Sequence, residues 1–93
     1  MTKIEGKREL TFDIAAGETV EITYKGYEKF TILNRTNGEI KVSSTNDFDD
    51  EYFIIPTGGG YSDYTPNPCF NAERTSTIYI CAVYSGQICI TSN

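Results

Sequence analysis

The stretch LTFDIAAGETVEI, residues 10–22, decides the fold of this chain. Apolar and polar residues alternate on both sides of a short turn, Ala15-Ala16-Gly17. Alternation with a period of two is typical of a strand that buries one face. We therefore expect strands over residues 9–14 and 19–24, joined by a three-residue hairpin loop with Gly17 at positive φ.

Two further turns repeat the pattern, Thr36-Asn37-Gly38 and Tyr84-Ser85-Gly86, each with Gly in third place. Gly38 and Gly86 are therefore also expected at positive φ. A two-residue loop would put the flanking apolar sets on opposite faces, because a slip of one residue turns every side chain over. Three-residue loops keep the sets in phase, so an antiparallel all-β protein is predicted. The paired inward positions are Phe12 with Val20, Leu10 with Ile22, Ile32 with Val42, Ala82 with Ile88, and Ile80 with Ile90.

Further strands are expected at residues 30–35, 39–44, 52–55, 76–83 and 87–92. The predicted fold is an antiparallel β-sandwich of about seven strands, jelly-roll or immunoglobulin-like. Consecutive strands of a sandwich can also lie in different sheets, so the Ala15-Ala16-Gly17 link has a second interpretation as an arch. Residues 1–9 are expected to be a loose N-terminal arm, and residues 10–93 a single domain.

Composition narrows the classes of function. The 93 residues, 39% hydrophobic and 23% charged, suit one globular domain. No apolar run approaches the roughly 18 residues of a membrane helix, and residues 1–9 lack the apolar core of a signal peptide. We therefore expect a protein that stays in the cytoplasm and has no membrane partner. The net charge of −5 argues against nucleic acid, which needs clustered Lys and Arg.

The residues needed for most catalysis are missing. The chain has no His, which is the commonest general base and the commonest metal ligand. Paired carboxylates stay possible in principle. The run Gly58-Gly59-Gly60 is not followed by a helical pattern, as a phosphate-binding loop would require. We expect neither an enzyme nor a cofactor.

The three cysteines are expected to be reduced thiols, because no export signal points to an oxidising compartment. The hairpin register places Cys81 directly opposite Cys89, so a cross-strand disulfide is the alternative. Cys69 is expected in a loop, remote from both.

The last predicted hairpin is apolar on both faces. Its second face carries Tyr79, Cys81, Val83 and Cys89. Either residues 57–75 or another subunit must cover it, since large exposed apolar patches are unusual on monomers. We expect a homo-oligomer, a dimer or trimer, with Tyr79 and Val83 among the contacts.

Residues 57–75 form the longest segment without a strand pattern, and such segments are often functional. Tyr61 and Tyr64 in this segment are candidate contacts for a glycan or a protein, unless their rings cover the sheet. Residues 47–51 are acidic and suit either a solvated loop or calcium.

Three segments carry a family resemblance: GETVEITYKGYEKFTILNRTNGEIKVSS (17–44), YFIIPTGGGY (52–61) and STIYICAVYSGQICITS (76–92). They resemble small β-sandwich proteins encoded in phage and prophage structural modules. The resemblance implies a capsid-decoration or fibre protein of the virion. It also implies assembly in the host cytoplasm as a symmetric homo-oligomer, in contact with a capsid or tail component. No site residue follows from it. The alternative function is recognition of cell-surface carbohydrate through Tyr61 and Tyr64.

Overall fold

The computed structural model describes residues 1–25, 30–43, 48, 52–58, 60–64 and 75–92, with only the backbone described at 53, 60–64 and 75–76. No helix long and apolar enough to cross a membrane occurs in these ranges. They contain nine strands: β1 (Thr2–Glu5), β2 (Glu9–Ile14), β3 (Thr19–Lys25), β4 (Phe30–Thr36), β5 (Ile40–Ser43), β6 (Phe53–Ile55), β7 (Gly60–Tyr64), β8 (Thr75–Ala82) and β9 (Gly86–Ser92).

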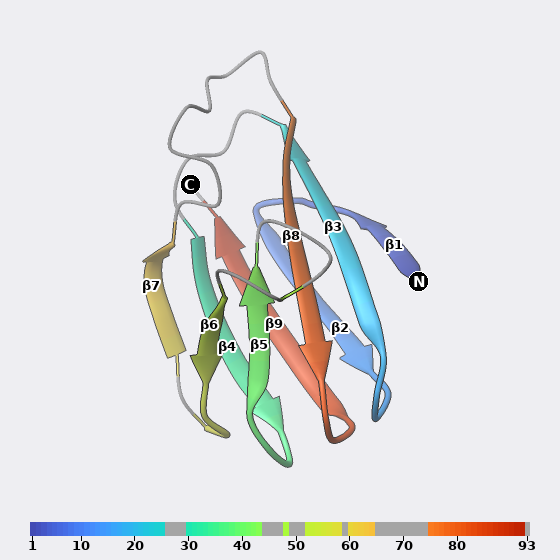
Figure 1. Ribbon diagram of the computed structural model, residues 1–93. Coiled ribbons are helices and arrows are strands. Elements are labelled where there is room, and N and C mark those ends of the chain that lie inside the picture. The colour runs from blue at the N-terminus through green and yellow to red at the C-terminus, as the bar shows by residue number, and fades with distance from the viewer. Residues whose placement is uncertain (26–29, 44–47, 49–51, 59, 65–74, 93) are drawn as a thin grey trace.

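The strands form two sheets packed face to face (Figure 1). Sheet A has the order β1-β3-β8-β5-β6, and sheet B has the order β2-β9-β4-β7. The β1–β3 pair is parallel and every other pair is antiparallel. The predicted all-β sandwich is therefore confirmed.

The strand order distinguishes between the two predicted architectures. Strand β2 pairs with β9, β3 with β8, β4 with β7 and β5 with β6. Strands β2 to β9 thus form one long hairpin that is folded over into two layers, in which β2 and β9 are paired. This is the jelly-roll arrangement of two four-stranded sheets, to which β1 adds a further edge strand.

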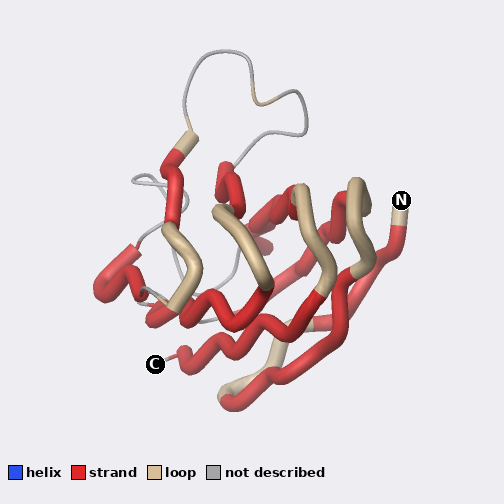
Figure 2. Tube along the Cα trace, turned by 90° about the horizontal axis from the view of Figure 1, so that it is seen from below, coloured by secondary structure: helices blue, strands red, loops and turns tan. Residues whose placement is uncertain are grey.

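The three predicted hairpins are wrong, because each of the three turns is an arch between the sheets. For Ala15-Ala16-Gly17 this confirms the second interpretation, in which the link is an arch. Strands β2, β4 and β9 belong to sheet B, while β3, β5 and β8 belong to sheet A. Figure 2 shows the connecting loops crossing from one layer to the other at the same end of the sandwich. The apolar faces still agree, since both sheets point their apolar side at the core.

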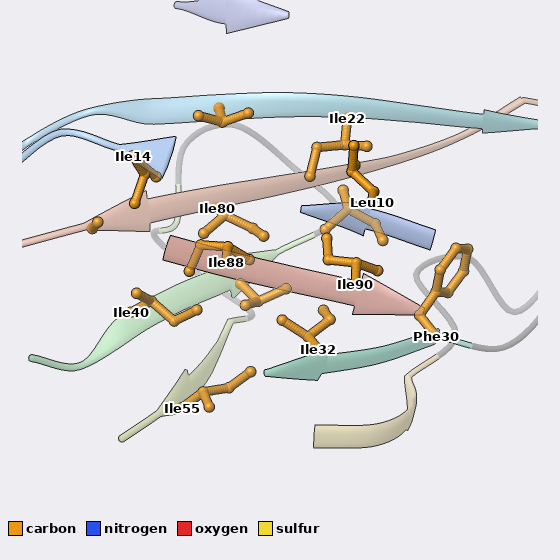
Figure 3. Close-up of a cluster of buried hydrophobic side chains, with 14 of the residues drawn as sticks. Leu10, Ile14, Ile22, Phe30, Ile32, Ile40, Ile55, Ile80, Ile88 and Ile90 are labelled. Atoms are coloured by element: carbon orange, nitrogen blue, oxygen red, sulfur yellow. The ribbon is translucent and has the colours of Figure 1, made fainter. Parts of the chain in front are cut away.

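The core lies between the layers and draws side chains from both (Figure 3). Tyr24 on β3 packs against Phe30 on β4, with ring centroids 4.6 Å apart. Phe12 is half-buried against this core. The other predicted inward residues are all buried: Leu10, Val20, Ile22, Ile32, Val42, Ile80, Ala82, Ile88 and Ile90.

Two segments expected to be irregular contain strands, which raises the strand number from about seven to nine. Residues 1–9 include β1, and the Gly6 N–H extends its pairing by donating to the Thr23 carbonyl at 2.7 Å. Residues 57–75 include β7, which pairs with β4 at the edge of sheet B. Residues 59 and 65–74 of that segment, Cys69 among them, lie outside the described part.

The β2–β3 arch is a β-turn, closed by the Glu18 N–H, which donates to the Ala15 carbonyl at 3.0 Å. Gly17 has φ 78°, as predicted, and occupies the turn position that requires positive φ. The Glu18 carboxylate accepts the Thr2 hydroxyl and, at 2.9 Å, the Ala15 N–H. These two hydrogen bonds lower the pKa of Glu18, because they favour the ionised form. The arch is thereby tied to β1.

Gly86 starts β9 in the middle of sheet B, with φ 156°. It pairs with Ile14 on one side and Thr36 on the other. A Cβ atom here would overlap the Thr36 Cα and lie 2.8 Å from the Arg35 carbonyl oxygen. The close approach of two backbones therefore requires glycine.

Gly38 is not among the described glycines with positive φ, so that prediction is wrong. Its lack of a side chain makes room for the ring of Tyr84 on the β8–β9 arch. The glycine thus packs one arch against its neighbour.

The side-chain amide of Asn34, a buried polar group on β4, lies at the end of the core where the arches cross. It joins β4 to the β4–β5 arch and to the end of β6. Its Nδ2 donates to the carbonyls of Gly38, at 2.8 Å, and Ile55, at 2.9 Å. Its Oδ1 accepts the Thr36 N–H at 2.9 Å. The Thr36 hydroxyl lies 2.7 Å from Oδ1 and 2.8 Å from the Gly38 carbonyl oxygen, and its one hydrogen is shared between these two acceptors. The Asn34 carbonyl accepts the Gly58 N–H at 2.9 Å. Both N–H donors and the oxygen of the amide have partners, as a buried amide requires.

We predict that Gly86→Ala lowers the free energy of unfolding by about 2 kcal/mol, because the new methyl group meets backbone atoms at a strained φ. Gly17→Ala is the control: it shares positive φ, but nothing lies within 4 Å of the added Cβ, so about 1 kcal/mol is expected. Urea unfolding measures both. Equal losses would show that the close packing at Gly86 is absent.

We predict that Asn34→Ala costs about 3 kcal/mol, because it removes the buried hydrogen bonds of the amide to the Ile55 carbonyl and from the Thr36 N–H. Asn37→Ala is the matched control, since Asn37 is exposed and its Nδ2 donates only to the Ser85 carbonyl at 3.2 Å. That change should cost about 0.5 kcal/mol or less. Similar unfolding midpoints for the two variants would contradict the role assigned to Asn34.

Candidate interaction surface

Exposed apolar side chains gather on the outer side of sheet A. The described residues include five large apolar side chains that are exposed: Met1 (64%), Tyr52 (39%), Ile54 (50%), Val83 (53%) and Tyr84 (55%). Tyr84 lies in the β8–β9 arch and packs on Gly38 in the β4–β5 arch. Ile54 lies on β6, Tyr52 and Met1 directly precede β6 and β1, and Val83 directly follows β8. Four of the five thus lie on, or directly beside, strands of sheet A.

The register shows how β8, β5 and β6 present this surface. Lys41 on β5 pairs with Cys81 on one side and Ile54 on the other. All three alternate with buried residues of their strands and so point outward. We call the group Tyr79, Cys81, Val83, Lys41, Tyr52 and Ile54 the β8–β6 surface.

Lys41 has a defined position on this surface. Its Nζ lies 5.0 Å from the centroid of the Tyr52 ring, within the range of a cation–π interaction. The residue is half-buried, because its aliphatic stem crosses the apolar surface while its charged end reaches Tyr52. The surface therefore combines apolar area with a single oriented cation.

Tyr79 and Glu21 form a second oriented group, beside the first. The Tyr79 hydroxyl donates to Glu21 Oε1 at 2.8 Å, from β8 to β3. Lys3 Nζ lies 3.9 Å from Glu21 Oε2, but its side chain is largely exposed and this ion pair contributes little. The hydrogen bond to Glu21, together with burial, raises the pKa of the Tyr79 phenol.

The structure brings together three of the four residues predicted for the second apolar face. Tyr79, Cys81 and Val83 all belong to the outer row of β8. Cys89 does not, because β9 lies in sheet B and Cys89 pairs there with Thr11 and Leu33.

The predicted pairing of Cys81 with Cys89 is therefore wrong. The two thiols point outward from opposite layers, so a disulfide between them is excluded. Both are free, as predicted for reduced thiols. Cys69 lies outside the described residues.

The predicted contacts Tyr61 and Tyr64 lie on β7 and not in an irregular loop. Tyr61 pairs with Ile32, and Tyr64 pairs with Phe30. Their side chains are outside what the structure describes, so the glycan and protein contacts predicted for them stay predictions. Within the described ranges no three His, Cys, Asp or Glu side chains gather as a metal site. Residues 47 and 49–51 of the acidic segment lie outside those ranges.

Sequence reasoning missed Tyr52, Ile54 and Lys41. Residues 52–55 are all apolar, a pattern typical of a strand that is covered on both faces. In the structure β6 is an edge strand and Ile54 is half exposed. One signal was present: the strand is short and ends at Pro56, and short strands with a nearby proline are common at sheet edges.

The chain matches no protein-family model, no curated protein and no solved structure in the comparisons made.

We predict that the Tyr79 phenol titrates above pH 10, the ordinary value for tyrosine. Since its folded-state pKa is raised, the stability gained from this pair is complete below pH 10 and is lost as the pH rises through the folded-state value. Tyrosinate absorbance of the wild type and of Tyr79→Phe identifies the late transition. Glu21→Gln should move the transition back toward pH 10. An unchanged titration curve in Glu21→Gln would rule out the carboxylate as the cause.

Proposed function

We propose that this protein is a non-enzymatic structural module that acts through homo-oligomeric and protein–protein contacts, as an accessory protein of a phage virion. Capsid decoration or a place in a fibre are the two forms of this role. The observation that carries the proposal is the β8–β6 surface, where Ile54, Val83 and Tyr52 stay exposed. Exposed apolar area of this kind typically marks an interaction site.

The fold supports the proposal by analogy. Jelly-roll sandwiches occur in viral capsid proteins, and also in lectin domains and cupins. A fold shared by such different proteins cannot select among them. The β8–β6 surface favours assembly, because its exposed groups are apolar and aromatic and lie on a sheet, where a broad partner can cover them.

The scaffold is suited to a mechanical role. The β2–β3 arch is bound to β1 through Glu18, and the β4–β5 arch is bound to the end of β6 through Asn34. These contacts hold the loops at one end of the sandwich in place. A rigid scaffold loses little entropy when its surface docks, which favours assembly.

We expect sedimentation equilibrium to report a homo-oligomer, and Val83→Asp to weaken it at least tenfold by placing a charge without a partner in the contact. Val83 is exposed, so the stability of the subunit should change by about 0.5 kcal/mol or less. Thr31→Asp is the matched control, because Thr31 is exposed on the outer face of sheet B. A molar mass of one chain at every concentration would refute the oligomeric function.

The virion role has its own test. Mass spectrometry of phage particles, purified by density gradient from the source organism, should find this chain in many copies per particle. Its absence from intact particles would refute the accessory role and leave the assembly surface unaffected. A glycan array is the parallel measurement, since binding that is lost in Tyr61→Ala or Tyr64→Ala would favour the carbohydrate-binding alternative.

A further inference from the structure

We infer that the free edge of β1 is a docking site for a second copy of this chain, which adds its own β1 antiparallel to the first and joins the two A sheets. The inference rests on the proposed homo-oligomeric function and adds a second contact to it. Strand β3 separates β1 from β8, so the new contact is separate from the β8–β6 surface. The backbone of β1, the order of its charges and its place in the fold carry the argument.

The free edge of β1 presents the backbone groups of Lys3 and Glu5. The Gly6 N–H donates to the Thr23 carbonyl at 2.7 Å, so the backbone of Gly6 faces β3. Successive residues of a strand direct these groups to opposite edges, and the backbone of Ile4 therefore also faces β3. The N–H and carbonyl groups of Lys3 and Glu5 point away from the sheet. An edge with such groups is a template for a further strand.

The sequence of β1 is complementary to itself in one register. With the two-fold axis at Ile4, Lys3 of each copy lies opposite Glu5 of the other. The outward backbone groups of these two residues then meet as hydrogen-bonded pairs. Their side chains place opposite charges next to each other twice, which stabilises an antiparallel pair. A shift of the axis by one residue would place Lys3 opposite Lys3, or Glu5 opposite Glu5, which is unfavourable.

The neighbouring charges on β3 leave this pattern intact. Strand β3 carries Glu21 and Lys25, one charge of each sign. Glu21 pairs with Lys3 across the sheet, and Lys3 Nζ lies 3.9 Å from Glu21 Oε2 in an exposed ion pair. Lys25 lies two positions beyond Thr23, the partner of Glu5. The strand beside β1 therefore adds no net charge that would repel a second copy.

Strand β1 is held in place and stands clear of sheet B. The Thr2 hydroxyl donates to the Glu18 carboxylate. Gly6 packs against the Tyr24 ring, where a Cβ atom would lie 2.4 Å from the nearest ring atom. In Figure 1, β1 is the outermost strand and extends beyond β2 of the sheet behind it. A second copy can thus approach the edge, and because the strand is already ordered, docking costs little entropy.

The side chain of Ile4 gains cover in the proposed register. It is half-buried and packs against the core between the sheets. The two copies of Ile4 form the central pair that shares no hydrogen bonds, with their Cα atoms about 4.5 Å apart. Each Ile4 therefore covers part of the apolar surface that the other leaves exposed.

Two other edges of the sandwich lack this complementarity. Strand β2 carries Glu9 and Asp13 and no basic residue, so pairing two copies would bring only like charges together. Strand β6 has three residues and is followed by Pro56, features that protect an edge from further pairing. The side chains of β7, at the fourth edge, lie outside the described part.

The contact is small. Two strands of four residues bury less than the roughly 1,200 Å² of a stable interface. We therefore expect a weak dimer when β1 acts alone. In an assembly that also uses the β8–β6 surface, the two contacts strengthen each other, because binding at one raises the effective concentration at the other.

Charge exchange within one chain tests the register, in a Val83→Asp background that weakens the β8–β6 contact. Sedimentation equilibrium at low ionic strength should report a monomer–dimer equilibrium. Lys3→Glu and Glu5→Lys should each raise its dissociation constant at least fivefold, because each creates two like-charged pairs. The double variant with both changes should return to within about twofold of the background. Arg35→Glu and Glu39→Lys are the matched controls: they make the same charge changes on exposed residues remote from β1 and should have no effect.

The double variant also excludes an effect within the subunit. Lys3→Glu removes the ion pair with Glu21, and the double variant does not bring that pair back. Its recovery can therefore come only from the contact between copies. Urea unfolding of each variant confirms that the subunit is folded.

Amide hydrogen exchange tests the backbone pairing directly. Exchange at Lys3 and Glu5 should slow about threefold or more when the protein concentration rises from a tenth of the dissociation constant to ten times that value. Exchange at Ile4 and Gly6 should not change, since these amides already face β3. Association without added protection at Lys3 and Glu5 would refute the pairing of the two strands.

The remaining outcomes separate this inference from the proposed function. A Val83→Asp protein that stays monomeric at millimolar concentration refutes the β1 contact, and a wild type that still associates leaves the β8–β6 surface standing. Single charge variants that are weakened without recovery in the double variant refute the register. Association that Val83→Asp leaves unchanged but the charge variants weaken supports β1 and refutes the β8–β6 surface.

Discussion

The hydrogen bonds of the Asn34 amide determine how one end of the sandwich closes. The amide links β4 to the β4–β5 arch and to the end of β6, and both its N–H donors and its oxygen have partners inside the core. Backbone carbonyls that leave a sheet in the interior must find donors, because no water reaches them. Asn34 supplies these donors to Gly38 and Ile55. The chain can therefore leave sheet B after β4 and return to it after β6 without burying unpaired polar groups.

The arches in turn decide what the outer faces carry. Because each short connection crosses between layers, β8 lies between β3 and β5 in sheet A, and its outward residues meet those of two other strands. A hairpin of β8 with β9 would have combined Cys81 with Cys89. The arch instead combines Tyr79 with Glu21, and Cys81 with Lys41. The surface proposed for assembly is thus a consequence of the jelly-roll order and cannot be found along any single hairpin.

The period of two in the sequence predicts well which side chains of a strand face the core. It predicts poorly which strands pair with one another. It identifies the inward residues of six strands, because a side chain that alternates into the core does so in either sheet. It does not distinguish an arch from a hairpin of the same length, since both keep the two flanking strands in phase. Gly17 and Gly86 have the predicted positive φ, whereas Gly38 is a glycine for reasons of packing. Asn34 gave a visible signal as a polar residue at an inward position, in phase with Phe30 and Ile32, but its partners come from segments distant in sequence.

The central claim is that copies of this chain associate through the β8–β6 surface. Isotope-filtered NOE spectroscopy on a mixture of labelled and unlabelled protein tests it most directly, because only contacts between copies give signals. The account predicts intermolecular signals from the methyl groups of Ile54 and Val83, and none from Leu33 on the outer face of sheet B. Intermolecular signals from Leu33 without any from Ile54 would contradict it.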